Sequence, residues 1–287
     1  MKTGVIDVGG GFRSSFGTGI LDYCLDHSIT FDYCIGVSAG SANLCSYMAE
    51  QKGRNLYFYT KYFDRWQYMS IKNLVETGSY IGLDYIYSDL SNHDGEYPLD
   101  WKKIRDGHRD LVIVATNALT GEPHYFHKWD MRQDEYDPIK ASCCVPVVNR
   151  PYVIDGTPYF DGGLSDPVPY KKAFEDGCDK VVLILTRPAA FKRAPKKDKV
   201  ITDLLKPLHP HAAEAMANRA EVYNRCVEEC LQLQEEGKMI VLAPDDIGDM
   251  KTLTKDVEEI KALYQKGYDA GTLIPKEWFE SKYIEKG

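Results

Sequence analysis

The sequence predicts an α/β fold, with a mostly parallel central sheet flanked by helices and a helical lid or cap. Short β-branched runs alternate with longer mixed segments from the first residues onward, which is typical of parallel strands joined by helices. The two earliest runs each end in a glycine-containing turn. With 287 residues, the chain can bury a sizeable core without disulfide bonds.

Two strand–turn–helix units open the chain. Residues 5–8 predict the first strand, which ends in three glycines at residues 9–11 and precedes a helix over residues 14–27. Residues 33–37 predict the second strand, followed at once by a helix of small residues over 39–51. The two glycine turns therefore lie at the carboxyl ends of neighbouring predicted strands.

The rest of the chain continues this alternation. Residues 57–101 have weak periodicity and predict short helices and loops over the sheet edge, where a lid would lie. Residues 151–160 predict a hairpin turning at Asp155-Gly156, because this pair supplies the positive φ angles of a tight turn. Further strands are expected at residues 111–116, 122–127, 181–185 and 239–243, and helices at about 212–236 and 255–267.

The composition excludes several classes of protein. A content of 44% hydrophobic and 27% charged residues excludes collagenous and disordered chains. The formal net charge of -8 disfavours a general nucleic-acid binder. No apolar run reaches the roughly 18 residues of a membrane-spanning helix, and the first residues lack the apolar region of a signal peptide. We therefore expect a cytoplasmic protein with no nucleic-acid partner.

The cysteines and histidines do not predict a metal site. The eight cysteines are scattered and none forms a C-x-x-C pair, so we expect reduced, small apolar core residues. His124 and His127 would face opposite sides of a strand, which makes joint ligation unfavourable. His209 and His211 could share one side, but they lack a nearby carboxylate or cysteine cluster.

A basic segment at residues 187–199 interrupts the alternation of strands and helices. Only Asp198 opposes its cations, which crowd around two prolines. These cations are Arg187, Lys192, Arg193, Lys196, Lys197 and Lys199. We expect an exposed loop, which could make transient contact with anionic lipid headgroups at a membrane surface. A merely solvated loop is the simpler interpretation.

Residues 36–40 read Gly-Val-Ser-Ala-Gly, the G-x-S-x-G pattern, at a predicted strand-to-helix turn. So sharp a turn projects the hydroxyl of Ser38 outward, and Gly36 and Gly40 permit the close backbone approach that it needs. The helix beginning behind Ser38 aims its free N–H groups at an oxyanion formed there. An ordinary helix start is the plain alternative for so short a pattern.

The glycine run after the first strand could offer consecutive amides to an anion. In a doubly wound sheet, such loops converge with their neighbours on one crevice. Alternatively, Gly9 and Gly11, with Ser14 in place of a third glycine and Asp32 about 20 residues on, resemble a degraded dinucleotide fingerprint. That hypothesis gives no role to Ser38 and its G-x-S-x-G turn.

Asp161-Gly162-Gly163 follows the predicted hairpin and is the third candidate element. A carboxylate held between a strand and a glycine turn could accept a proton directly from a serine hydroxyl, without an imidazole. A surface turn is the plain alternative, since Asp-Gly-Gly is common in turns.

These three elements, in this order, resemble the patatin-like phospholipase family, the Ser-Asp dyad lipid acyl hydrolases. The resemblance runs from residue 9 to Pro169 and includes residues 141–146, Ala-Ser-Cys-Cys-Val-Pro, which match the family's A-S-x-x-x-P segment. It implies that Ser38 is the nucleophile and Asp161 the base. It further implies an oxyanion hole and a supporting motif. The oxyanion hole comprises the amides of Gly10 and Gly11, and the supporting residues are Gly9, Arg13, Gly36, Gly40, Gly162 and Gly163.

The resemblance also bears on the domain organisation. It implies a single patatin-like domain over residues 1–287, with a motif-bearing core at about 4–186 and a C-terminal helical and strand extension at about 200–287. No repeat, linker or composition break divides the chain. In the family's glycine loop Arg13 fits the usual basic residue, whereas Ser14 replaces the usual glycine.

The favoured function is a serine hydrolase that cleaves acyl esters of lipids, phospholipase A-like or a lysophospholipase or esterase, through an acyl-serine. This chemistry requires no metal or cofactor, and its partner is a lipid or small ester substrate. Three alternatives stay open: an oxidoreductase binding a nucleotide at residues 9–11, a catalytically silent lipid-binding relative, and an α/β-hydrolase whose triad uses His209 or His211. Ser38 follows only two predicted strands, which argues against the α/β-hydrolase.

Overall fold

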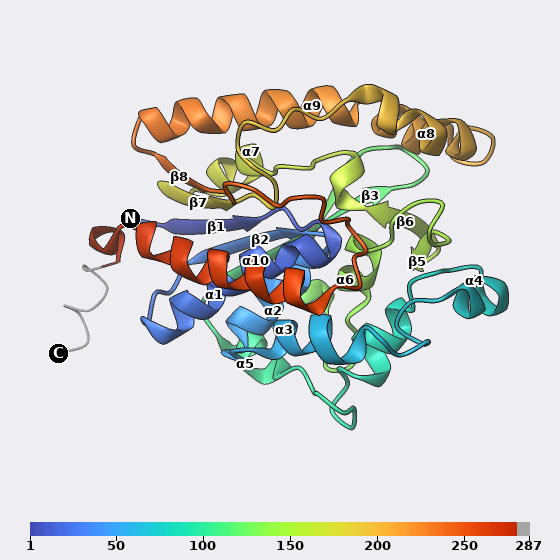
Figure 1. The fold of residues 1–287 in the computed structure, drawn as a ribbon, viewed down its shortest axis with the longest axis horizontal. Coiled ribbons are helices and arrows are strands. Elements are labelled where there is room, and N and C mark those ends of the chain that lie inside the picture. Colours follow the sequence, from blue (N-terminus) through green and yellow to red (C-terminus); the bar gives the residue numbers. More distant parts are fainter. Residues whose placement is uncertain (280–287) are drawn as a thin grey trace.

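The computed structural model describes residues 1–279, which form one eight-stranded sheet with helices on both faces (Figure 1). The strands are β1 Thr3–Asp7, β2 Tyr33–Val37, β3 Asp110–Asn117, β4 Pro123–His127, β5 Tyr152–Ile154, β6 Thr157–Asp161, β7 Lys180–Ile184 and β8 Met239–Leu242. Neighbouring strands in the order β3, β2, β1, β7, β8 are parallel. Strands β4 and β6 pair antiparallel with β3, and β5 pairs antiparallel with β6. The predicted fold class is confirmed.

The strands and the long helices lie within a few residues of their predicted positions. The α-helices are α1 Ser15–Asp26, α2 Ala39–Met48, α3 Arg54–Tyr57, α4 Ile71–Thr77, α5 Trp101–Asp106, α6 Asp137–Ser142, α7 Tyr170–Glu175, α8 Lys199–Leu205, α9 Pro210–Glu235 and α10 Val257–Ala270. The 3₁₀ turns are η1 Gly11–Ser14, η4 Lys128–Asp130, η5 Gly162–Leu164, η6 Pro195–Lys197, η7 Gly271–Leu273 and η8 Lys276–Trp278, and the π turns are η2 Phe58–Tyr62 and η3 Tyr85–Asp89. Sequence reasoning missed α5 to α8, because helices of six or seven residues show barely two turns of periodicity. Within residues 1–279, no helix is long and apolar enough to cross a membrane.

Alternate side chains of the central strands are buried on opposite faces of the sheet, as the two-residue period of a strand requires. Val5 and Ile113 belong to the apolar core shared with α1, α2 and α10. Ile6 and Val112 belong to a second core, shared with α7 and α9. Figure 1 shows α9 along one side of the sheet and α1 and α10 on the other. Because both faces are covered, the strands read as continuous apolar runs in the sequence.

Strand β3 pairs with two strands along the same edge. Along this edge, β3 first pairs with β2, whose last residue, Val37, lies opposite Val114. From Ala115 onward, the same edge pairs with β6, and Asp161 lies opposite Ala115. Strand β4 overlaps both of these stretches and so occupies the other edge of β3. The residue that follows β2 and the last residue of β6 therefore come together at the carboxyl end of β3.

The β5–β6 hairpin turns as predicted. Asp155 has a φ of 48° and Gly156 a φ of 77°, so both central residues adopt the left-handed conformation of a tight hairpin turn. The short turn delivers β6 to the edge of β3, and β6 ends at Asp161. Local turn chemistry thus fixes where this carboxylate emerges.

The expectation of an exposed basic loop at residues 187–199 holds for Lys192, Lys196 and Lys199 but is wrong for Arg187 and Arg193. Arg187 and Arg193 are partly buried and line a cavity, and Asp198 is buried against Arg193 in an ion pair of 3.1 Å. The loop is tied to α9, because the Arg193 N–H donates to Asn224 Oδ1 at 2.7 Å and Asn224 Nδ2 donates to the Arg193 carbonyl at 3.0 Å. Charge counting could not reveal these contacts with a distant helix.

Helix α10 packs across α1 at backbone contact distance. A Cβ atom on Gly267 would lie 1.9 Å from the carbonyl oxygen of Phe16, so any side chain there would force the helices apart. The loop that leads into α10 carries Thr252, whose carbonyl accepts a hydrogen bond of 2.9 Å from the Phe12 N–H in η1. The packing of α10 therefore holds this loop against the glycine turn after β1.

Gly267→Val tests this packing. We expect the substitution to lower the free energy of unfolding by roughly 1–3 kcal/mol, because a branched side chain cannot fit between the two backbones. Urea unfolding followed by circular dichroism measures the change. Ala262→Val places the same side chain on the exposed face of α10 and is the matched control. Equal destabilisation by both substitutions would contradict the close approach.

Candidate active site

Ser38 lies between β2 and α2 with φ 56° and ψ −135°, a strained conformation for a residue with a side chain. The turn leaves Ser38 partly exposed and facing a cavity. Two glycines permit it: a Cβ atom on Gly36 would lie 2.5 Å from Ser41 Cα, and one on Gly40 would lie 2.2 Å from the carbonyl oxygen of Asp7. The local backbone is therefore the sharp strand-to-helix turn that the G-x-S-x-G pattern predicts.

Ser142 braces this turn from behind. Its hydroxyl accepts a hydrogen bond of 2.8 Å from the Ser38 N–H and donates one of 2.6 Å to the Val114 carbonyl. Ser142 is fully buried at the end of α6, so these bonds are shielded from water. Sequence reasoning placed Ser142 in the A-S-x-x-x-P segment but gave it no role, and that segment was its one signal.

Asp161 is buried at the end of β6, and one of its carboxylate oxygens accepts a hydrogen bond of 2.8 Å from the Gly163 N–H. Burial raises the pKa of Asp161 above its ordinary value. The neighbouring hydroxyl of Ser38 opposes the rise as a hydrogen-bond donor, as do the charge of Arg219, the Gly163 amide and the charge of Arg193. The net result is a carboxylate more basic than an exposed aspartate and adjacent to a serine hydroxyl.

The glycine turn after β1 packs directly on the Ser38 turn. Gly9, Gly10 and Gly11 have φ angles of 68°, 133° and 61°, which glycine adopts with little strain. A Cβ atom on Gly9 would lie 2.2 Å from the Val37 carbonyl oxygen, so a larger residue would separate the two turns. The amides of Gly10 and Gly11 lie at the start of η1, where a helix provides no acceptor of its own.

Asp7 and Thr186 fix this glycine turn, and sequence reasoning missed both. Asp7 Oδ1 accepts a hydrogen bond of 3.0 Å from the Gly9 N–H, and its Oδ2 accepts one of 2.9 Å from Asn43 Nδ2. Burial raises the pKa of Asp7 to about 6. Thr186, just after β7, donates its hydroxyl proton to the Gly9 carbonyl at 2.5 Å. Asp7 gave no signal because it lies inside a predicted strand.

Ser14, which replaces the glycine usual in the family's loop, has an ordinary backbone conformation. Its φ of −65° and ψ of −6° are open to any residue. Its carbonyl oxygen accepts hydrogen bonds from Asn43 Nδ2 at 3.0 Å and from the Thr18 hydroxyl at 3.2 Å. Its hydroxyl is buried and has no hydrogen-bond partner among the described residues.

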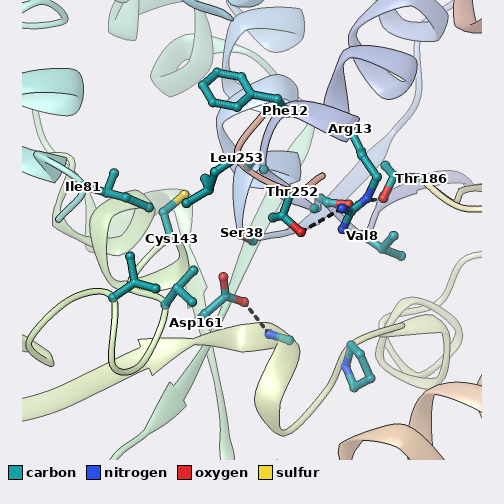
Figure 2. A pocket seen from close by; sticks show the side chains of 18 of the residues that line it. Val8, Phe12, Arg13, Ser38, Ile81, Cys143, Asp161, Thr186, Thr252 and Leu253 are labelled. Carbon is teal, nitrogen blue, oxygen red and sulfur yellow. Dashed lines mark hydrogen bonds between the residues drawn. The ribbon is translucent and has the colours of Figure 1, made fainter. Parts of the chain in front are cut away.

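A cavity of about 370 Å³ joins these groups (Figure 2). Of the predicted site residues, it is lined by Gly9, Gly10, Gly11, Arg13, Ser38, Asp161 and Gly163, whereas Gly36, Gly40 and Gly162 make close backbone contacts behind it. Figure 2 shows Ile81 and Cys143 on one side of Ser38, and Arg13 and Thr186 on the other. Residues of the predicted lid, including Tyr59, Met69 and Ile81, form the apolar wall.

In the structure, Asp32 does not lie near the glycine turn, where the acidic residue of a dinucleotide-binding site would be needed. Asp32 directly precedes β2 and accepts a hydrogen bond of 2.7 Å from the N–H of Thr3, at the beginning of β1. The glycine turn at residues 9–11 follows the other end of β1. A ribose held at that turn would therefore be a full strand length away from Asp32.

The histidines considered for a triad do not reach Ser38. Among the described residues that line the cavity, none is a histidine. His209 packs edge-on against Phe160, with ring centroids 5.2 Å apart, and His211 is exposed at the start of α9. Within residues 1–279, no three potential metal ligands cluster, and all eight cysteines are free and buried. The acidic side chain that neighbours Ser38 in the described site is that of Asp161.

Comparison with known protein families gives two matches. Residues 8–174 match the family model for patatin-like phospholipase, and residues 209–281 match a domain of unknown function, DUF6363. The chain belongs to the patatin-like phospholipase family.

Individual relatives are more distant. "Uncharacterized protein YjjU" of Escherichia coli (strain K12) is 28% identical over 193 residues, which cover 66% of this chain and 53% of YjjU. The chain thus spans about half the length of that relative. The crystal structure of VipD from Legionella pneumophila superposes with a TM-score of 0.49 and 16% identity, over 95% of this chain and 66% of VipD.

Ser142→Ala tests the brace behind the turn. We expect it to lower the free energy of unfolding by roughly 1–3 kcal/mol, because the Ser38 amide and the buried Val114 carbonyl lose their partner. Ser79→Ala is the control, since Ser79 Oγ accepts a comparable hydrogen bond from the Arg150 N–H at an exposed position. Urea unfolding measures both variants. If Ser142→Ala were no more destabilising than Ser79→Ala, the hydrogen bonds of Ser142 would not contribute measurably to the free energy of unfolding.

Proposed function

We propose that this protein is a serine hydrolase that cleaves acyl esters of lipids through an acyl-Ser38 intermediate. One observation carries the proposal: Ser38, on its strained turn, adjoins the buried carboxylate of Asp161 in a cavity with a largely apolar wall. Membership in the patatin-like phospholipase family supports the same class of reaction. Substrates of the phospholipase A, lysophospholipase or esterase type all present the ester that this site needs.

The reaction uses side chains, backbone amides and water. Ser38 Oγ attacks the ester carbonyl while Asp161 accepts its proton, and the amides of Gly10 and Gly11 stabilise the oxyanion. As the C–O bond breaks, Asp161 returns the proton to the leaving alcohol and the acyl group stays on Ser38. Water then attacks the acyl-serine with Asp161 again as base, which releases the fatty acid and restores Ser38.

The division of the cavity suggests how the substrate lies. The wall formed by Met69, Ile81 and Leu253 is apolar and suits an acyl chain, because burying methylene groups is favourable by roughly 0.8 kcal/mol each. The opposite side carries Arg13 and Thr186, near the glycine turn. An acyl chain on the apolar wall directs the alcohol part of the ester toward the polar side.

Ser38→Ala and Asp161→Asn test the dyad. We expect Ser38→Ala to abolish labelling by a fluorophosphonate probe, since no nucleophile remains, and Asp161→Asn to slow labelling and ester hydrolysis by roughly 100-fold or more, since an amide accepts no proton. Intact-mass spectrometry with peptide mapping locates the adduct. Circular dichroism and thermal melting confirm that each variant is folded.

Ser41→Ala is a useful comparison, because Ser41 lies in α2, directly after the Ser38 turn. Its hydroxyl donates to the Ser38 carbonyl at 2.6 Å. We expect the probe still to label Ser38 in that variant. A folded wild-type protein that forms no adduct and cleaves no ester would refute the proposed activity and favour a lipid-binding relative without catalysis.

The pH dependence tests Asp161 as the base. Only the ionised carboxylate accepts a proton, so kcat/KM for a soluble ester should fall as pH drops through the raised pKa of Asp161. Arg219 lowers this pKa, so Arg219→Gln should raise it and move the acid limb to higher pH. Arg225→Gln removes a charge from an exposed position of the same helix and should leave the limb in place. If kcat/KM fell at the same pH in Arg219→Gln and in wild type, the result would contradict Asp161 as the base.

A further inference from the structure

Four arginines gather at the polar end of the cavity. Arg13 comes from η1, Arg187 and Arg193 from the loop after β7, and Arg219 from α9. Three of them lie beyond residue 174, where the match to the patatin-like phospholipase model ends. This arginine cluster is therefore assembled largely by the part of the chain that the family pattern does not describe.

The positive charges of the arginine cluster outnumber the acidic residues around it. Among the described residues that line the cavity, the acids are Asp161 and Asp198. Asp198 accepts two hydrogen bonds from Arg193, at 3.1 and 3.3 Å. With both acids ionised, two positive charges are left over.

The close approach of like charges is evident at Arg13 itself. Burial and the charges of Arg187, Arg193 and Arg219 together lower the pKa of Arg13 to about 9. Burial likewise lowers the pKa of Arg219 to about 10. Packing four guanidinium groups together is costly, so their assembly in one cavity calls for a compensating anion.

Two N–H donors of the arginine cluster also lack hydrogen-bond acceptors. Within residues 1–279, the Nε atoms of Arg13 and Arg219 are buried without a hydrogen-bond acceptor. Buried donors are almost always satisfied in folded proteins, so each exception points to a missing acceptor. Arg13 Nη1 donates to the Thr252 hydroxyl at 2.7 Å, and the guanidinium of Arg187 lies 4.4 Å from the Phe191 ring centroid. These contacts orient both side chains without neutralising them.

We propose that the arginine cluster is a subsite for the phosphate group of the substrate, and that the enzyme prefers esters carrying a phosphate monoester. The inference rests on the proposed esterase function and specifies its substrate class. A phosphate monoester brings close to two negative charges and three acceptor oxygens, which match the surplus charge and the planar forks of the guanidinium groups. A neutral alcohol supplies neither, and a phosphodiester with a cationic headgroup carries no net charge.

The position of the cluster fits such a substrate. Ser38 lies between the apolar wall and Arg13 in Figure 2, so an ester seated at Ser38 can place its acyl chain and its phosphate on opposite sides. Arg13 follows the proposed oxyanion glycines by two residues. A phosphate one short glycerol unit from the scissile ester would thus face the guanidinium groups.

The test compares three esters with the same acyl chain: monoacylglycerol 3-phosphate, the corresponding phosphocholine and the neutral monoacylglycerol, each below its critical micelle concentration. We expect wild type to favour the phosphate monoester by roughly 100-fold in kcat/KM over the neutral ester, through several charge-assisted hydrogen bonds. Arg187→Gln should reduce that preference by roughly tenfold. We chose Arg187 because it is not among the groups that act on the pKa of Asp161.

Arg225→Gln is the matched control and should keep the wild-type preference, since Arg225 is exposed on α9 outside the cavity. Equal kcat/KM for the phosphate and neutral esters in wild type would overturn the proposal while leaving the esterase function intact. An unchanged preference in Arg187→Gln would overturn it as well.

Calorimetry on the Ser38→Ala variant separates a headgroup subsite from a site for free phosphate. We expect monoacylglycerol 3-phosphate to bind at least tenfold more tightly than inorganic phosphate or monoacylglycerol, and Arg187→Gln in that background to remove most of this advantage. Inorganic phosphate binding as tightly as the ester would overturn the headgroup assignment. If wild type cleaves no ester, the proposed function fails, and the binding experiment still decides whether the arginine cluster takes a phosphate.

Discussion

The register of β3 is the constraint on which the rest of the site depends. One edge of β3 carries β2 as far as Val114 and then β6 from Ala115, so Ser38 and Asp161 meet where the two strands adjoin. Ser142 donates to the Val114 carbonyl and accepts from the Ser38 amide, which ties the serine turn to the same point of β3. A one-residue slip of β6 would turn Asp161 to the opposite face of the sheet.

The C-terminal part of the chain completes the site. The Thr252 carbonyl accepts the Phe12 N–H, and its hydroxyl accepts a hydrogen bond from Arg13. Thr186 holds the Gly9 carbonyl. Both threonines lie beyond the stretch that matches the patatin-like phospholipase model, yet they contact the glycine turn that this stretch contributes. Their contacts explain why the three-glycine turn, which has great conformational freedom on its own, keeps one shape.

The sequence was informative where chemistry is local. Strand periodicity, the Asp155-Gly156 turn and the glycines around Ser38 act over a few residues, so they could be read directly. Asp7, Ser142 and the buried arginines could not, because their roles arise from partners far away in the chain. Charge counting at residues 187–199 found Arg187 and Arg193 but not their partial burial, since Arg193 meets Asn224 of α9 only in the folded protein.

The arginine cluster and Asp161 are electrostatically coupled. Burial raises the pKa of Asp161, while the charges of Arg219 and Arg193 oppose part of that rise. A phosphate seated among the guanidinium groups, as in the proposed subsite, cancels part of their field at Asp161. The pKa of Asp161 then rises, and the carboxylate becomes a stronger base beside Ser38. A substrate that brings its own anion would therefore increase the basicity of Asp161, the proposed base.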